Sequence, residues 1–499
     1  MALFSSIPVD VLANILYDAR LQDVVAVAQV SSRLYAAMKN NRFLWTDAYA
    51  HDLKFLPLPT GHTLSTVPVR MIYSIASRYL SILEASRVVQ ADMRRYSMIS
   101  TSKSWSRFSS RGSGPVSVPG GRWTVYSTDD GFFLHDHDHT KLPDNVRNRD
   151  KNDTHIDIDV SAHLGSAPIL FESMGEGLVR CVQIAVDLES NIFPADNSIF
   201  RSPQSILNIF DINFSQMAEI TLQDQVPLIR HTPIKIQKNE EVVDMKGPLI
   251  LSVYGKHLAI TNYISRLAVM AEIEGLQDWQ YMIRQANFHP TLPKIIMEVH
   301  HSRQGEDSLV HRALWLVDIP PHVISDTQPC EDVSSDPANM TRESIQIKIT
   351  HSFWIPSVWP QPVKSDRQIP ETYIFVWELV VRNSLHAGET VALALCLTPE
   401  GKLEAIPIGS FPIEWRATRL QLRVIRSLPS QDQLAICFLC PLERTLKKKI
   451  LSLPSIGSVC DAVMIRQFDP LYGQIVLELL GSRDPRTGIS ERQSYVVQY

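Results

Sequence analysis

The feature that most constrains this chain is a long series of short apolar runs between Arg122 and Tyr499. The runs are rich in Val, Ile, Leu and aromatic residues, and Pro, Asn, Asp and Gly bound them, which is typical of β-strands. Residues 248–273 predict three successive strands joined by tight turns. Parallel strands need a long crossover, usually a helix, and no such helical stretch separates these runs. We therefore expect antiparallel meanders and a large all-β region.

A weak internal repeat predicts how these strands are arranged. Four runs each end in a carboxylate followed by Ile or Leu, namely residues 206–212, 267–273, 313–319 and 373–379. Their acidic positions, 211, 272, 318 and 378, lie 46 to 61 residues apart, close to the length of a propeller blade with insertions. The region 122–499 therefore predicts a β-propeller of six to eight blades, and we favour seven. A pair of large β-sandwiches is the alternative.

Two further features bear on the propeller prediction. Trp377-Glu378 is the nearest approach to the Trp-Asp signature of WD-repeat proteins, so the region resembles a divergent WD-repeat-like propeller. A strand at 494–498 could pair with an early strand such as 123–126. That pairing would close the ring and cover both sheet edges.

The first 55 residues have a helical pattern instead. Ser6 and Pro8 are placed to begin a first helix, in which the apolar residues at 11, 12, 15 and 16 share one face. Asp23 predicts the N-cap of a second helix that ends near residues 39–41. A third, short helix contains Phe43 to Tyr49. Residues 1–55 therefore predict a small three-helix module.

Two segments connect this module to the β region. Residues 56–100 contain an amphipathic stretch, about Val67 to Arg95, that predicts a connector helix. Residues 101–121 are rich in Ser, Arg and Gly and predict a loop or linker. The chain as a whole is therefore expected to be an α+β multidomain protein, with its β-domain over 122–499.

Four elements of the helical region resemble an F-box. They are Ile7-Pro8, an acidic residue with a Leu/Ile-rich helix, the run Val30-Ser31-Ser32-Arg33, and a terminal Leu44-Trp45. Ile7 and Asp10 stand where the family pattern has Leu and Glu, and both changes are conservative. The match covers about a tenth of the chain. The resemblance implies docking on a Skp-type adaptor, and through it on a cullin scaffold, in an SCF-type ubiquitin ligase.

The physical chemistry of the module agrees with that implication. A three-helix unit of this size buries too little surface to be stable alone, and it has more aliphatic residues than its own core can use. We expect the surplus to form an exposed apolar face that binds the adaptor. The candidate adaptor-binding residues are Ile7, Pro8, Val11, Leu12, Ile15, Leu16, Val24, Val27, Val30, Leu34, Leu44 and Trp45. The alternative is that they pack against the chain's own connector helix.

Other chemistry-bearing patterns are weaker. His135, His137 and His139 would share one face of a strand and could bind zinc, although a surface-exposed polar turn is the favoured interpretation. Trp354 and Trp359 lie in a Pro-punctuated segment and are weak candidates for a substrate-binding aromatic surface, although core packing is the favoured interpretation. Cys437 and Cys440 are expected to be reduced and buried. We therefore expect no metal site, no cofactor and no catalytic residues.

Composition narrows the class of partner. The formal charge is −5, from 48 Lys and Arg against 53 Asp and Glu, so nucleic acid and anionic membrane are not expected as partners. Six scattered cysteines favour a reducing compartment, and no apolar run approaches the ~18 residues of a membrane helix. We expect a non-enzymatic substrate receptor of the cytoplasm or nucleus that binds a protein substrate. A metal-dependent hydrolase on a propeller, and a propeller scaffold outside any ligase, are the alternatives.

Overall fold

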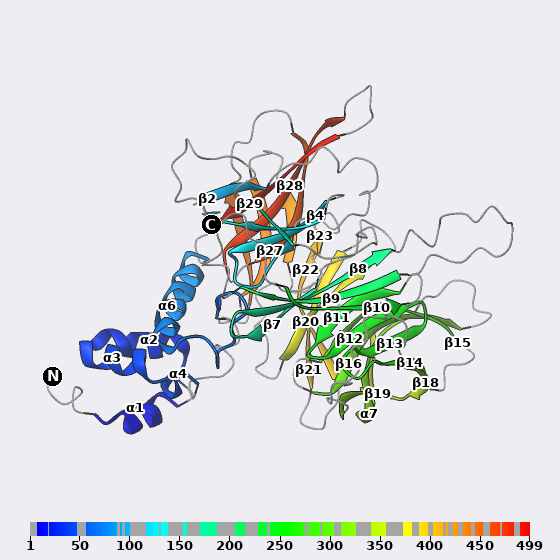
Figure 1. The fold of residues 1–499 in the computed structure, drawn as a ribbon, viewed down its shortest axis with the longest axis horizontal. Helices are drawn as coiled ribbons and strands as arrows, with labels where there is room; N and C mark the ends of the chain where they lie inside the picture. Colours follow the sequence, from blue (N-terminus) through cyan, green and yellow to red (C-terminus); the bar gives the residue numbers. More distant parts are fainter. Residues whose placement is uncertain are drawn as a thin grey trace.

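The chain has a small helical part and a large all-β part (Figure 1). The computed structural model describes residues 7–17, 19–46, 56–86, 90–91, 95–99, 116–128, 131–137, 153–156, 170–186, 205–214, 228–236, 240–274, 279–289, 292–303, 311–325, 341–355, 373–381, 389–397, 403–412, 416–417, 423–427, 433–440, 445–452, 460–469, 472–483 and 490–499. None of the helices in these ranges combines the length and apolarity that a bilayer span requires.

The described residues of the N-terminal part contain four short helices, where the sequence predicted three. They are α1 (Val9–Leu16), α2 (Leu21–Val30), α3 (Ser32–Asn40) and α4 (Phe43–Thr46). The predicted second helix is broken at Ser31, whose backbone is extended and whose hydroxyl accepts a hydrogen bond from the N–H of Leu34 at 3.2 Å. Serine is a favoured N-cap, so it ends one helix and begins the next. Asp23, the predicted cap, lies inside the first turn of α2.

The helices share one apolar core with α6 (Val69–Ser86), the predicted connector helix. Trp45 is fully buried there, and its indole N–H donates to the carbonyl of Met38 at 2.7 Å. Tyr79 of α6 is buried in the same core, and Tyr73 packs edge-on against Tyr35 with ring centroids 4.9 Å apart. The module is therefore completed by a helix from outside its predicted boundary at residue 55.

The helix after the module is shorter than the sequence predicted. It ends at Ser86, and two strands follow within the predicted connector, β1 (Gln90–Ala91) and β2 (Arg95–Ile99). The β part of the chain thus begins before residue 100, because these strands complete sheets formed by the C-terminal strands. Most of the predicted linker, residues 101–115, lies outside the described residues, and its end forms β3 (Val116–Ser117).

The described strands form seven sheets, which we number in chain order. Sheet 1 contains β3, β4 (Trp123–Thr128), β5 (Gly131–Asp136) and β6 (Asp153–Ile156). Sheet 2 contains β7 (Leu170–Gly175), β8 (Leu178–Val186), β9 (Ser205–Asn213) and β10 (Leu228–Ile236). Sheet 3 contains β11 (Glu241–Lys246), β12 (Leu249–Tyr254), β13 (His257–Asn262), β14 (Leu267–Ile273) and β18 (Thr341–Ile347).

The remaining sheets come from the C-terminal half. Sheet 4 contains β15 (Trp279–Phe288), β16 (Lys294–Arg303), β17 (His311–Asp318) and β19 (Ile349–Ile355), with the short helix α7 (Pro321–Ser325) after β17. Sheet 5 contains β20 (Tyr373–Val381), β21 (Glu389–Leu397) and β22 (Leu403–Pro412). Sheet 6 contains β23 (Arg416–Ala417), β24 (Arg423–Ser427), β25 (Gln433–Cys440), β26 (Thr445–Ser452) and β1. Sheet 7 contains β27 (Cys460–Asp469), β28 (Gln474–Arg483), β29 (Ser490–Gln498) and β2.

Each sheet contacts the next in chain order, and the last contacts the first. Sheets 1 and 2 share an apolar cluster, and contacts then join β7 to β11, β11 to β15, β19 to β22, β22 to β26 and β24 to β27. The series returns to its start because β27 contacts β3. There the hydroxyl of Ser117 donates to the side-chain oxygen of Gln474 at 3.3 Å. The order of contacts is therefore cyclic.

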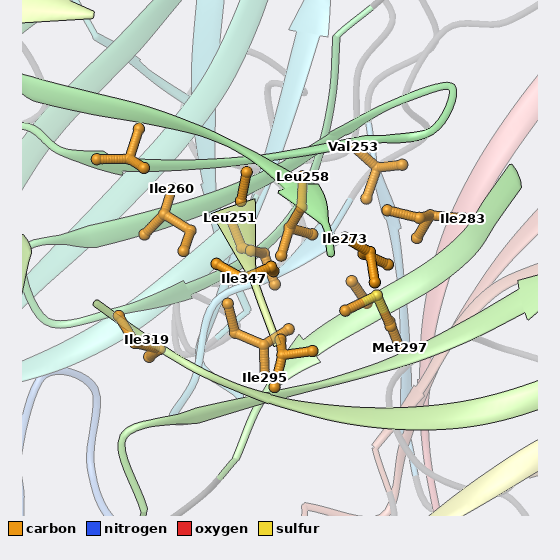
Figure 2. Packing of buried hydrophobic residues seen from close by; sticks show 14 of the residues in the cluster. Leu251, Val253, Leu258, Ile260, Ile273, Ile283, Ile295, Met297, Ile319 and Ile347 are labelled. Carbon is orange, nitrogen blue, oxygen red and sulfur yellow. The ribbon is translucent and has the colours of Figure 1, made fainter. Parts of the chain in front are cut away.

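The largest described core lies between sheets 3 and 4. Figure 2 shows its centre, where Leu251, Leu258 and Ile260 face Ile295 and Met297 from the neighbouring sheet. All five side chains are fully buried. At roughly 25 cal/mol per Å² of buried apolar surface, a face of this kind supplies the main energy that holds one sheet on the next.

The four repeated runs are strands of four consecutive sheets. They form β9, β14, β17 and β20, although they do not hold the same place in each sheet. Two of their carboxylates lie directly opposite a basic residue on the neighbouring strand. Asp211 accepts two hydrogen bonds of 2.8 Å from Arg180, and Asp318 pairs with Lys294. In these two runs the repeated carboxylate therefore forms a cross-strand ion pair.

The predicted closing strand pairs differently from the expectation. β29 pairs with β28 and with β2, in antiparallel register from Arg95 opposite Gln498 to Ile99 opposite Ser494. The expected partner at 123–126 is β4, which instead lies between β3 and β5. The terminal strand therefore pairs with an early strand, as predicted, but that strand is β2 and not the example at 123–126.

Half-buried polar side chains join sheet 2 to sheet 3 and sheet 3 to sheet 4. Glu172 of β7 accepts a 2.9 Å hydrogen bond from the backbone of the β11–β12 turn. Asp244 of β11 accepts from the N–H of Phe288 at 2.7 Å, and the ammonium of Lys246 donates to the carbonyl of His289 at 2.7 Å. Burial raises the pKa of Asp244 although these hydrogen bonds favour its charged form. The side chains of Glu172, Asp244 and Lys246 therefore hold neighbouring sheets together.

His289 makes the stability of this region pH-dependent. Burial, with the charges of Lys246 and Lys294, lowers its pKa from 6.5 to about 4, and its Nδ1 accepts a 3.0 Å hydrogen bond from the N–H of Leu292. The unfolded chain takes up this proton near pH 6.5 and the folded chain only near pH 4, so stability is lost as the pH falls between them. From pH 7 to pH 4.5 we expect the wild type to lose about 2 kcal/mol more than His289→Gln in urea unfolding. Equal losses would contradict this account.

Candidate functional site

The candidate site is the outer face of α1. Pro8 is the N-cap of this helix and Asp10 lies in its first turn, where a negative charge is favourable. Apolar residues then fall on two sides of the helix. Leu12 and Leu16 are buried in the module core, whereas Val11 and Ile15, one turn apart, are 46% and 56% exposed. The helix therefore has one apolar side for its own core and a second that its chain leaves uncovered.

Half of the predicted adaptor-binding residues are in fact core residues. The six buried ones are Leu12, Leu16, Val24, Leu34, Leu44 and Trp45. They pack with one another and with α6, which the sequence analysis had as the alternative. They are therefore not part of the exposed apolar face that the sequence predicted, and their contact with an adaptor stays a prediction. Their physical role is to hold α1 in place.

The other six predicted residues remain at or near the surface. Pro8, Val11, Ile15 and Val30 are exposed, and Ile7 and Val27 are half-buried. Sequence reasoning missed three large exposed side chains of the same module, Tyr17, Tyr35 and Phe43. Tyr17, at the end of α1, is 70% exposed. A sequence signal for it existed, since it follows Leu16 outside the apolar spacing of the helix.

The predicted histidine cluster is buried, where the sequence favoured an exposed polar turn. His135 and His137 are each 3% exposed, and their ring centroids are 5.0 Å apart. Nε2 of His137 lies 2.7 Å from the hydroxyl of Thr124 on β4. Between them, Asp136 accepts two hydrogen bonds from Arg122, at 3.0 and 2.7 Å. His139 lies outside the described residues.

The residues that the structure describes include no group of three or more His, Cys, Asp or Glu arranged to hold a metal ion. Cys181 and Cys396 are buried free thiols, and burial raises the pKa of Cys181. Cys437 and Cys440 lie on β25. Their side chains lie outside the described residues.

One of the two tryptophan candidates can be placed. Trp354 lies near the end of β19, the outermost strand of sheet 4, and is 53% exposed. It is therefore a surface residue, where core packing was the favoured alternative. Trp359 lies outside the described residues.

Comparisons with known proteins leave the family open. No protein-family model and no curated protein matches this sequence. Among solved structures, a Bacteroides uniformis protein assigned as a 6-phosphogluconolactonase is 14% identical, over 73% of this chain and 91% of its own, with a TM-score of 0.31. The AfRom2 CNH domain is 10% identical, over 81% and 99%, with a TM-score of 0.28. A chain of the yeast Nup82-Nup159-Nup116 nucleoporin complex is 9% identical, over 68% and 87%, with a TM-score of 0.33. At these scores we take neither fold nor function from them.

The two sides of α1 predict opposite responses to truncation. Leu12→Ala removes a buried side chain and leaves a cavity, so it should cost about 2–5 kcal/mol of helical stability. Val11→Ala, one residue away and exposed, should change stability by less than about 0.5 kcal/mol. Urea unfolding followed at 222 nm measures both. Similar losses for the two variants would mean that the outer face of α1 is covered.

Proposed function

We propose that this protein is a substrate receptor of an SCF-type ubiquitin ligase. In this proposal, α1 and its neighbours bind a Skp-type adaptor, and the β part holds a protein substrate. The supporting observation is the uncovered apolar face of Val11 and Ile15, within a segment whose sequence resembles an F-box. Apolar side chains exposed in a row on one helix are suited to contact with another polypeptide.

The second part of the proposal is that the seven sheets are blades of one seven-bladed propeller. Three observations support it: the sheets number seven in the described residues, their contacts follow chain order, and the last contacts the first. The addition of β2 to sheet 7 gives further support, since it joins early and late strands in one blade. A ring of this kind buries most sheet edges and presents loops at both ends.

The proposed mechanism is proximity, with the chemistry on other subunits. A receptor that binds adaptor and substrate together raises the local concentration of substrate lysines near a ubiquitin-charged enzyme. The buried charges described above have structural partners, as Arg180 has in Asp211 and Asp136 has in Arg122. This favours a binding protein over the metal-dependent hydrolase, because the side chains of His135 and His137 are buried.

A scaffold outside any ligase is the second candidate. Its support is that six of the twelve predicted adaptor-binding residues stabilise the chain's own module. The two functions differ in whether the outer face of α1 has a partner.

Adaptor capture tests the proposal directly. Purified protein is incubated with a tagged recombinant Skp adaptor, and recovery is compared between wild type and the double variant Val11→Asp, Ile15→Asp. We expect recovery to fall at least tenfold, because two charges would be desolvated in an apolar interface. Gln22→Asp, which adds the same charge at an exposed position of α2, is the matched control and should bind as the wild type does.

Two results would overturn the proposal. One is failure of the wild type to retain the adaptor at micromolar concentration. The other is equal retention by the wild type and the double variant, which would place the contact elsewhere and favour the scaffold. Circular dichroism of both variants confirms that the helices are intact.

A further inference from the structure

Residues 56–67, between α4 and α6, are attached to the β part at several points. The hydroxyl of Tyr472 donates to the carbonyl of Leu58 at 2.6 Å. The N–H of Gly177 donates to the carbonyl of Gly61 at 3.2 Å. Tyr472 lies in the β27–β28 turn and Gly177 in the β7–β8 turn. A segment of the helical part is therefore fixed to sheets 7 and 2 together.

The same segment meets the β part so closely that glycine is required. A Cβ on Gly61, whose φ is +73°, would lie 2.3 Å from the carbonyl carbon of Gly177. A Cβ on Gly120, in the β3–β4 turn of sheet 1, would lie 2.2 Å from the hydroxyl oxygen of Thr60. Backbone thus packs directly on backbone, and the contact reaches a third sheet.

The other side of the segment belongs to the helical core. Leu56 and Val67, at its two ends, are buried with α2, α3 and α6. The guanidinium of Arg42, between α3 and α4, donates to the carbonyls of Leu64 and Val67. Residues 56–67 are therefore held on both faces, by the helices on one and by the turns of three sheets on the other.

We propose that residues 56–67 act as a clamp that fixes the direction of the outer face of α1 relative to the β part. Gly61, Gly120 and Tyr472 are its positioning residues. A free chain of this length would let its ends spread over about 20 Å. The clamp removes that freedom, and its use in placing a substrate at a set distance from an adaptor rests on the proposed function.

The clamp predicts a single narrow distance between the two parts. Spin labels carried by non-natural amino acids at Arg33 of α3 and Glu404 of β22, both exposed, avoid the six native cysteines. Double electron–electron resonance on the full chain then measures the distance distribution. We expect one narrow peak for the wild type, and at least a doubling of its width in Gly61→Ala.

A matched glycine controls for backbone strain. Gly255, in the β12–β13 turn, has a φ of +60° and no atom within 4 Å of an added Cβ. Gly255→Ala therefore has the same unfavourable backbone conformation without the clash, and it should keep the narrow peak. A broad wild-type distribution, or a Gly61→Ala peak as narrow as the wild type, would overturn the clamp.

Two further measurements distinguish failure of the clamp from failure of the proposed ligase function. If Gly61→Ala does not fold, Tyr472→Phe removes only the hydroxyl that binds Leu58, and an unbroadened peak in that variant would overturn the proposal. Adaptor capture by Gly61→Ala should equal that of the wild type, because the outer face of α1 is unchanged. A narrow peak in a wild type that captures no adaptor would refute the ligase role and leave the clamp standing.

Discussion

Pairing between strands from opposite ends of the chain is the constraint on which the rest of the architecture depends. β1 adds to β26 in parallel and β2 adds to β29 in antiparallel register, so each of these two strands covers one edge of a sheet formed by the C-terminal strands. An uncovered edge presents a row of unpaired backbone groups to other chains. Because α6 ends only four residues before β1, the helices are attached where the two ends of the chain meet.

The helical part shows why an apolar pattern alone does not define a binding surface. Leu12 and Val11 are neighbours on α1 and equally apolar, yet one is core and the other is exposed. Periodicity places them on different sides of the helix, but which side is covered depends on the core that α1 joins, and that core includes α6 from outside the predicted module. Tyr79 of that helix is buried against residues that the family pattern would assign to a partner.

The roles of the histidines and repeated carboxylates likewise depend on which residues they contact in the fold. His135 and His137 have the spacing of metal ligands, and Asp211 and Asp318 recur like members of a site. In the structure, His137 meets a threonine hydroxyl and each of the two carboxylates meets a basic residue on the next strand. The buried groups among these, His137 and Asp211, need hydrogen-bonding partners, and residues on neighbouring strands supply them.

Local sequence determined the secondary-structure elements. Periodicity and turn residues account for the N-terminal helices, the strands from Trp123 onward, the four repeated runs and the antiparallel meander of residues 248–273. Only the tertiary structure decided their long-range contacts. It gave β29 the partner β2 in place of β4, and brought Gly61 against Gly177 across more than a hundred residues. The reason is physical. Periodicity and capping act over one or two turns of chain, whereas the cover on an apolar face, the partner of a strand and the approach of two backbones depend on segments far apart in sequence, which local patterns do not encode.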